Sequence, residues 1–346
     1  MRIAFVIHTA GQAFFWKNIM GELIARGHQI GVLSREKAVE PDFIAQSQVQ
    51  CGTYKDGKKS AYGKLMQLPF QLITSYRFLS RFKPDVIAGA SILEANTSAI
   101  LRKPCIIFED TEITPALERL QWQFTASQIV TPACFRKDLG KKQLRIEGFK
   151  ELAYLHPNYF RPDPSILREL GVTSQEKYVI IRFNSFKAVH DIGLRGFSLE
   201  ERYQAVRTLG KYARIFIAAE GRLPQDLEAY KLPIPTKRIH QAISYAQMLF
   251  GDSGTMSTEA AILGTPAIRC NSGLGDNELG NFIEMEHRYG LMYCILGVER
   301  GLQKAVELLQ NPNLKEEWNQ KRQKLLAETI DVTRFMVNLI EHQARR

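Results

Sequence analysis

A chain of 346 residues is about twice the length of a typical domain, so two domains are expected. Hydrophobic residues make up 45% and charged residues 24% of the chain, and no run of eighteen apolar residues predicts a membrane-spanning helix. The amino terminus does not resemble a signal peptide, because its apolar run ends at His8. The five cysteines are scattered without a CxxC pair, which favours reduced thiols in a cytoplasmic protein over disulfides or a zinc site.

The net charge of +10 suggests three classes of partner: nucleic acid, an anionic membrane or a phosphorylated small molecule. The basic residues are spread along the chain, and no RNA-binding motif or arginine-rich arm stands out, so nucleic acid is not expected. A merely solvated basic face is one alternative. The other is a cytoplasmic enzyme that takes a phosphate-bearing substrate and touches the inner face of an anionic membrane peripherally.

The first half of the chain alternates apolar runs with helical patterns, an order that builds parallel sheets. Residues 3–7 form the first expected strand, a helical stretch closed by Gly27 follows, and a second strand is expected at 29–33. A long helical segment at 64–82 precedes three further expected strands, which are residues 85–89, 105–108 and 128–130. This half is predicted to form a Rossmann-like domain.

Three prolines within residues 156–164 predict a linker, because proline continues neither a helix nor a central strand. Strand and helix patterns then resume; the expected strands are 178–183, 214–218, 248–251, 266–270 and 291–295, with a helix at 199–211 and closing helices at 315–328 and 333–343. We therefore expect an α/β protein with two doubly wound, Rossmann-like parallel-sheet domains facing a central cleft. The first spans residues 1–160, completed by the C-terminal helix 332–346, and the second spans 161–331.

The stretch from Phe250 to Pro266 predicts a strand, a small polar turn and a helix that stops at Gly264. Ser253, Gly254 and Thr255 fall where a helix amino terminus presents unpaired N–H groups, which together with the helix dipole favour a phosphate. Glu259, within the first two turns, is a candidate acceptor of ribose hydroxyls. The alternative is a helix cap with no ligand.

Other polar residues follow strands of the second half and are candidates to bind the same ligand. Arg182 and Lys187 could neutralise phosphate, and His190 could position it, although an exposed basic loop is the alternative. Further candidates, each with a turn, cap or surface loop as the alternative, are Glu220, His240 and Asn271.

In the first half, His8 follows the first strand and is a candidate general base. No GxGxxG motif is present, which disfavours a dehydrogenase. Asp110 and Glu112 follow another strand and are acceptor-binding or general-base candidates, with a solvated loop as the alternative. No ligand spacing predicts a metal site.

The segments Asp252-Ser253-Gly254, Glu259-Ala260 and Leu263-Gly264-Thr265-Pro266 resemble the DSGG…EEA…LGKP stretch of UDP-N-acetylglucosamine 2-epimerases and the corresponding stretch of GT-B glycosyltransferases. Thr255 stands here for the second Gly of that pattern and Thr258 for its first Glu. Further motifs in order, among them Arg182-Phe183, Glu220-Gly221-Arg222 and Gly280-Asn281-Phe282, are similar to a prokaryotic family of unknown function within the GT-B superfamily.

This resemblance implies a GT-B fold, a diphosphate held by Ser253, Gly254 and Thr255, and a ribose held by Glu259. It implies metal-independent sugar transfer from a nucleotide-sugar donor to a glycan or lipid-linked acceptor in surface glycan or glycolipid synthesis, with no cofactor required. The alternatives are an epimerase-like isomerase and a non-catalytic nucleotide-sugar-binding protein.

Overall fold

The computed structural model describes residues 1–36, 38, 49–55, 61–184, 196–219, 221–271 and 278–345, with the backbone alone at 61–66 and 271. The chain forms two compact units. Met1–Tyr154 and Ile330–Arg346 make up unit 1, and Leu155–Thr329 makes up unit 2. Within the described ranges, no helix is both long and apolar enough to cross a membrane.

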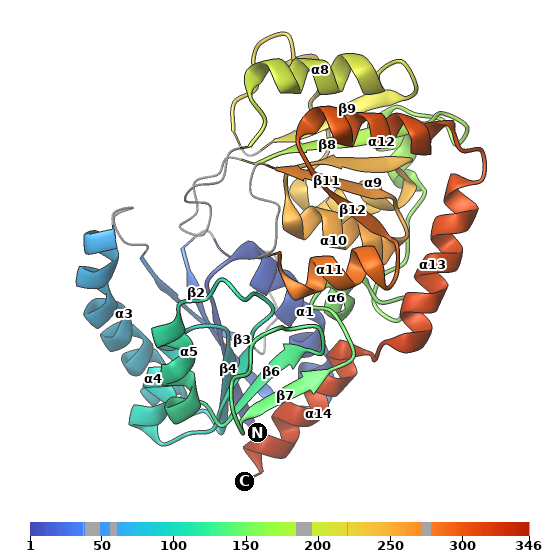
Figure 1. Cartoon of the computed structure of the whole chain (residues 1–346). Helices are drawn as coiled ribbons and strands as arrows, with labels where there is room; N and C mark the ends of the chain where they lie inside the picture. The colour runs from blue at the N-terminus through green and yellow to red at the C-terminus, as the bar shows by residue number, and fades with distance from the viewer. Residues whose placement is uncertain are drawn as a thin grey trace. The chain divides into compact units, whose positions relative to one another are not determined.

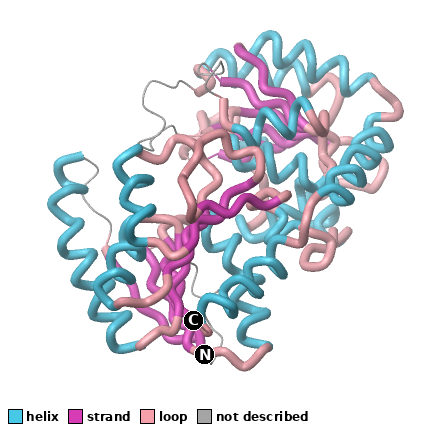
Figure 2. The backbone as a smooth tube through the Cα atoms, turned by 60° about the horizontal axis from the view of Figure 1, so that its bottom comes forward, coloured by secondary structure: helices cyan, strands magenta, loops and turns pink. Residues whose placement is uncertain are grey.

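Unit 1 is built on a seven-stranded parallel sheet with the order β3-β2-β1-β4-β5-β6-β7 (Figures 1 and 2). Its strands are β1 (Arg2–Ile7), β2 (Gln29–Arg35), β3 (Val49–Tyr54), β4 (Val86–Gly89), β5 (Cys105–Phe108), β6 (Gln128–Pro132) and β7 (Gln143–Ile146). The central strands β4 and β5 are buried along their whole length, as expected for a parallel sheet covered on both faces.

Helices cover both faces of this sheet: α3, α4 and α5 lie on one face, and α1 and α14 on the other (Figure 1). The helices of unit 1 are α1 (Ala10–Ala25), α3 (Ala61–Phe82), α4 (Ile92–Leu101), α5 (Ala116–Thr125), α6 (Leu152–Leu155), whose last residue belongs to unit 2, and α14 (Val332–Ala344). Helix α14 packs against α1 and contributes Met336, Val337 and Ile340 to the core, all without exposed surface. The hydroxyl of Thr333 donates to the carbonyl of Ala153 at 2.7 Å.

Unit 2 is built on a five-stranded parallel sheet with the order β12-β11-β10-β8-β9. Its strands are β8 (Tyr178–Phe183), β9 (Arg214–Ala219), β10 (Met248–Gly251), β11 (Ala267–Asn271) and β12 (Met292–Leu296). Its helices are α7 (Ser165–Leu170), α8 (Leu199–Leu209), η2 (Glu228–Tyr230), η3 (Thr236–Arg238), α9 (Ile239–Tyr245), α10 (Gly254–Leu263), α11 (Gly280–His287), α12 (Val298–Gln310) and α13 (Leu314–Glu328). Helices α8 and α12 pack together, and α10 packs against α9, α11 and α13 (Figure 1).

The α/β class and the two parallel sheets predicted from the sequence are confirmed. Helix α10 ends where expected, because Gly264 takes the left-handed conformation (φ +77°) that glycine adopts without strain. Strands β3 and β7 were not predicted from the sequence. Both lie at the edges of the sheet in unit 1 and are only partly buried, so neither carries the apolar run that marks the central strands.

Candidate functional site

In unit 2 the best-formed candidate site is the amino terminus of α10, at the carboxyl ends of β10 and β8. Ser253 caps the helix, its hydroxyl accepting from the amide of Met256 at 3.4 Å. Gly254 is partly exposed and Thr255 is exposed, while the helix beyond them is buried. The exposed surface of this helix is therefore its first turn, where the backbone N–H groups point outward.

Gly254 is required by close packing. A Cβ at this position would lie 2.6 Å from Cζ of Phe282 on α11, so a side chain here would have to displace that ring. The guanidinium of Arg269, at 4.2 Å from the centroid, lies over the same ring and forms an ion pair with Glu278 at 2.9 Å. The buried guanidinium of Arg269 and the first turn of α10 therefore pack against the same Phe282 ring.

His240 and Glu259, which the sequence analysis proposed as separate nucleotide contacts, lie together. Nε2 of His240 is 3.0 Å from Oε1 of Glu259, and both side chains are buried. His240 is the second residue of α9, and the Phe160 ring meets its imidazole edge-on at 6.4 Å between centroids. A carboxylate held by an imidazole has a fixed orientation, which suits a group that must receive two neighbouring hydroxyls.

Asp252 is buried directly before the helix. Its Oδ1 accepts from the amide of Asn184 at 2.7 Å and so joins the segments that follow β10 and β8. Burial raises the pKa of the Asp252 carboxyl to about 6, although hydrogen bonds and the nearby Arg182 guanidinium favour the ionised form. Arg182 itself donates to Oδ1 of Asn184 at 3.3 Å.

Four of the predicted ligand residues are not placed side by side with this group. Lys187, His190 and Glu220 lie outside the described residues. Asn271 is the last residue of β11, and its backbone alone is described.

In unit 1, His8 follows β1 and lies between two side chains that the sequence analysis missed. Its Nε2 is 2.9 Å from Oε2 of Glu94, and its Nδ1 forms a hydrogen bond with the hydroxyl of Tyr54. The backbone amide of His8 donates to Oε1 of Gln12 at 2.8 Å. The imidazole is therefore fixed on both nitrogens.

Glu94 is wholly buried at the start of α4, where it completes a capping box with Ser91. One carboxylate oxygen accepts from the amides of Ala90 and Ser91, and the other faces His8. A Cβ at Gly89 would overlap this carboxylate, so the glycine at the end of β4 makes room for it. The spacing Ser91-x-x-Glu94 after a strand is the sequence signal that could have located it.

Asp110 and Glu112 both take part in local contacts. Oδ2 of Asp110 is 2.5 Å from Nζ of Lys150, and Oε1 of Glu112 accepts from the amide of Arg136 at 2.8 Å. The neighbouring Glu109 is buried, and burial raises its pKa to about 7. It accepts from both the amide and the hydroxyl of Thr111, at 2.7 and 3.0 Å.

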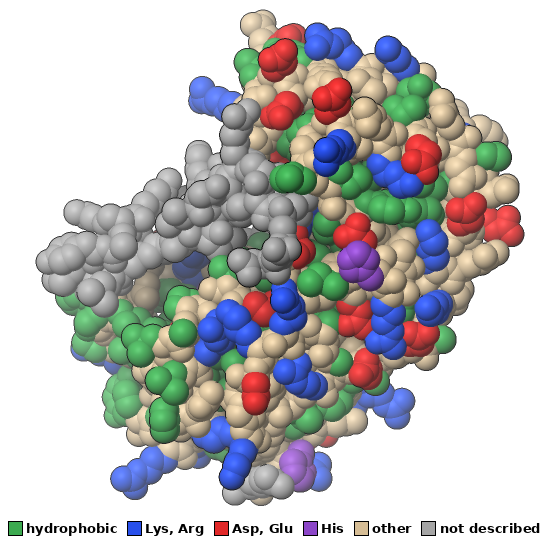
Figure 3. Space-filling model, in the orientation of Figure 1, with side chains coloured by type: hydrophobic (Ala, Val, Ile, Leu, Met, Phe, Trp, Pro, Cys, Tyr) green, Lys and Arg blue, Asp and Glu red, His purple; other side chains and the backbone are tan. Residues whose placement is uncertain are grey.

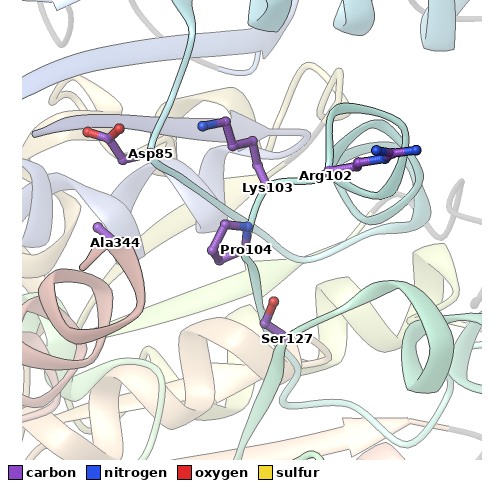
Figure 4. Close-up of a pocket in the computed structure, with 6 residues that line it drawn as sticks. All are labelled: Asp85, Arg102, Lys103, Pro104, Ser127 and Ala344. Atoms are coloured by element: carbon purple, nitrogen blue, oxygen red, sulfur yellow. The ribbon is translucent and has the colours of Figure 1, made fainter. Parts of the chain in front are cut away.

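A cavity of about 470 Å³ lies at the amino-terminal ends of the strands of unit 1, opposite to the strand ends that carry His8 and Asp110. Arg102, Lys103 and Ser127 are among its lining residues (Figure 4). Since none of the predicted site residues lines it, we do not assign the chemistry to this cavity. Among the described residues, no group of three or more His, Cys, Asp or Glu side chains could hold a metal ion.

A family model described as "Protein of unknown function (DUF354)" matches residues 51–345. A search of curated proteins found no match. Among solved structures, MnaA of Staphylococcus aureus with UDP is 12% identical, with a TM-score of 0.69, covering 99% of this chain and 97% of that one. The glycosyltransferase VinC with DTDP is 13% identical (TM-score 0.63), with both chains fully covered. MurG of Acinetobacter baumannii is 14% identical (TM-score 0.60), covering 99% of this chain and 100% of the other. The chain therefore has a GT-B-type fold.

Proposed function

The chain belongs to the DUF354 family, and we propose that it is a metal-independent glycosyltransferase that moves a sugar from a nucleoside-diphosphate donor to a hydroxyl of a glycan or lipid-linked acceptor. The structures of similar fold include one with UDP and one with DTDP, which supports the choice of a nucleotide as ligand. The observation that carries the choice of reaction is the pair formed by the partly exposed His8 and the wholly buried Glu94.

In this proposal, unit 2 binds the donor. The backbone N–H groups of Gly254 and Thr255 hold the diphosphate, because the helix dipole and the unpaired donors both favour negative charge there. Arg182 adds a positive charge beside the same strand ends. Glu259, oriented by His240, receives the ribose hydroxyls. These donors stabilise the diphosphate as it leaves with the electrons of its bond to the sugar.

Unit 1 supplies the base. The acceptor oxygen attacks the anomeric carbon while its proton moves through the Tyr54 hydroxyl to Nδ1 of His8, and the diphosphate departs. Glu94 faces Nε2 and holds the proton of the neutral imidazole on that nitrogen, which leaves the lone pair on Nδ1. Because Glu94 has no exposed surface, its charge stabilises the imidazolium in a medium that screens it poorly.

An epimerase-like isomerase is the second candidate, and Glu109 is the observation in its favour. A carboxyl with a pKa of about 7 at the end of a strand is suited to exchange a proton with carbon at neutral pH. The two functions differ in their products. Incubation with UDP-N-acetylglucosamine in deuterated water labels C2 if the sugar is epimerised, whereas transfer leaves C2 unlabelled and releases UDP.

The test of transfer combines calorimetry with turnover. We expect at least one UDP-, GDP- or dTDP-sugar to bind, and release of its nucleotide when a cell extract supplies acceptor. Glu94→Gln should lower kcat by about 100- to 10,000-fold and leave the donor Kd within about twofold, because the variant removes general-base catalysis and not the donor contacts.

Glu118→Gln is the matched control. Glu118 is a half-buried carboxylate of unit 1 that accepts from the amide of Ile92 at 3.1 Å, an interaction that glutamine can retain. The Glu118→Gln variant should lower kcat by less than about tenfold. Equal losses in both variants would show that His8 needs no specific partner, binding without turnover would indicate a nucleotide-sugar-binding protein, and no binding of any donor would refute the proposal.

A further inference from the structure

The outer surface of α3, α4 and α5 carries an unusual concentration of apolar side chains. Twelve large hydrophobic residues of the described chain are exposed, and eight of them fall between Phe70 and Phe124. These eight, which we call the apolar patch, are Phe70, Ile73, Tyr76, Ile100, Ile113, Leu117, Leu120 and Phe124. The space-filling view shows hydrophobic side chains gathered over α3 and α5 (Figure 3).

Half of the apolar patch has the spacing of one face of a helix. Ile113, Leu117, Leu120 and Phe124 follow one another at four, three and four residues, so they form one stripe along α5 and the turn before it. Leu117 and Phe124 are each 77% exposed, while the opposite side of the helix buries Trp122. The helix is therefore apolar on both sides. A soluble surface helix keeps one side polar, and an apolar outer stripe marks a contact surface.

Basic side chains accompany the patch. Between residues 67 and 142, all described, the exposed charged residues comprise one acid, Asp138, and eight bases, which are Arg77, Arg81, Lys83, Arg102, Lys103, Arg136, Lys137 and Lys141. Helices that alternate with parallel strands end at the edge where the strands begin, so the carboxyl ends of α3, α4 and α5 share one edge. Arg81 lies in the last turn of α3, Arg102 and Lys103 follow α4, and Lys142 donates to the carbonyl of Ala126 after α5 at 2.7 Å. We call Arg77, Arg81, Lys83, Arg102 and Lys103 the basic rim.

We propose that the apolar patch and the basic rim together dock the protein on the surface of an anionic lipid bilayer. Apolar side chains enter the boundary between head groups and acyl chains, while lysine and arginine meet the anionic head groups. A second copy of the chain would fit the apolar area but not the charge. A symmetric contact brings the same surface of both copies together, and here the stretch from 67 to 127, which spans α3 to α5, exposes five bases and no acid. The proposal does not depend on the proposed function.

Vesicle sedimentation tests the proposal, with the whole chain and without nucleotide. We expect binding to vesicles of phosphatidylcholine and phosphatidylglycerol at a ratio of 7:3, little binding to phosphatidylcholine alone, and weaker binding as salt rises. Each basic residue near an anionic surface contributes roughly a fivefold factor, so Arg77→Gln with Arg81→Gln should lower partitioning about 25-fold. Leu117→Gln with Phe124→Gln should lower it about tenfold or more.

Unit 2 offers matched controls for both pairs. Arg207→Gln with Lys211→Gln removes two exposed charges at the same spacing of four residues, and Leu199→Gln with Leu296→Gln removes two half-exposed leucines. Both should leave partitioning within about twofold. Failure to bind anionic vesicles, or equal losses in test and control pairs, would overturn the proposal. So would a dimer by analytical ultracentrifugation that Leu117→Gln with Phe124→Gln converts to monomer, because a second copy would then cover the patch.

Discussion

Glu109 illustrates how a single buried carboxyl can make stability depend on pH. It lies at the carboxyl end of β5 and is 6% exposed. Burial raises its pKa from 4.5 to about 7, and the hydrogen bonds from Thr111 and Thr114 offset only part of this effect. The folded protein therefore holds a proton on Glu109 at pH values where the unfolded chain has released it.

The sign of the pH dependence follows directly. Between pH 4.5 and 7 the folded state binds more protons at this residue than the unfolded state, so the free energy of unfolding falls as pH rises through that window. The loss should reach roughly 3 kcal/mol. Glu109→Gln mimics the protonated form and should be more stable than wild type at pH 8 but not at pH 4.5. Urea unfolding at both pH values measures this, and an equal difference at the two would contradict it.

At the scale of single residues, the sequence suggested part of the candidate site but not its partners. His8 was proposed because it follows an apolar strand. Its contacts Glu94 and Tyr54 lie 86 and 46 residues away in the chain, and each comes from a different strand–helix segment. Spacing along the sequence cannot reveal such pairs, because the order of the strands in the sheet brings them together. His240 and Glu259 were both proposed, but their pairing across α9 and α10 depends on packing for the same reason.

At the scale of elements, the apolar runs of the central strands were enough to predict them, because β1, β4, β5 and β10 are buried almost throughout. The edge strand β3 was not predicted, since half of its sequence VQCGTY is exposed and only Tyr54 is buried. That omission mattered for the site, because β3 ends at Tyr54, which contacts His8. Edge strands owe their place to pairing with a neighbour more than to their own hydrophobicity.

Two glycine-to-alanine substitutions distinguish the close packing at the start of α10 from the ordinary gain in helix propensity. Gly254→Ala introduces a methyl group 2.6 Å from the buried Phe282 ring, and we expect a loss of about 1–3 kcal/mol in unfolding free energy together with weaker nucleotide binding. Gly21→Ala lies within α1 and meets no atom within 4 Å, so it should stabilise the protein by about 0.5–1 kcal/mol. Thermal unfolding and donor calorimetry measure both effects. If Gly254→Ala kept both stability and affinity, the first turn of α10 would not be the diphosphate site.

At the scale of the whole molecule, the chain returns to unit 1 at its end. Ile330–Arg346 belongs to unit 1 although Leu155–Thr329 comes between. Side chains of α14 are buried in this unit, and Glu341 lies 2.8 Å from His28 and 3.1 Å from Arg26. Each unit has its own sheet and core, so each is expected to unfold cooperatively by itself.

This organisation predicts that core substitutions act on one unit at a time. Met336→Ala on α14 and Leu325→Ala on α13 each remove a side chain with no exposed surface, and each should cost about 2–5 kcal/mol. Hydrogen exchange read by mass spectrometry should locate the loss of protection in residues 1–154 and 330–346 for Met336→Ala and in residues 155–329 for Leu325→Ala. A nucleotide that binds the folded unit 2 should restore protection in Leu325→Ala alone, because binding stabilises only the unit that holds the ligand. Loss of protection throughout the chain in either variant would mean that the two units unfold as one, and the ligand would then rescue both variants equally.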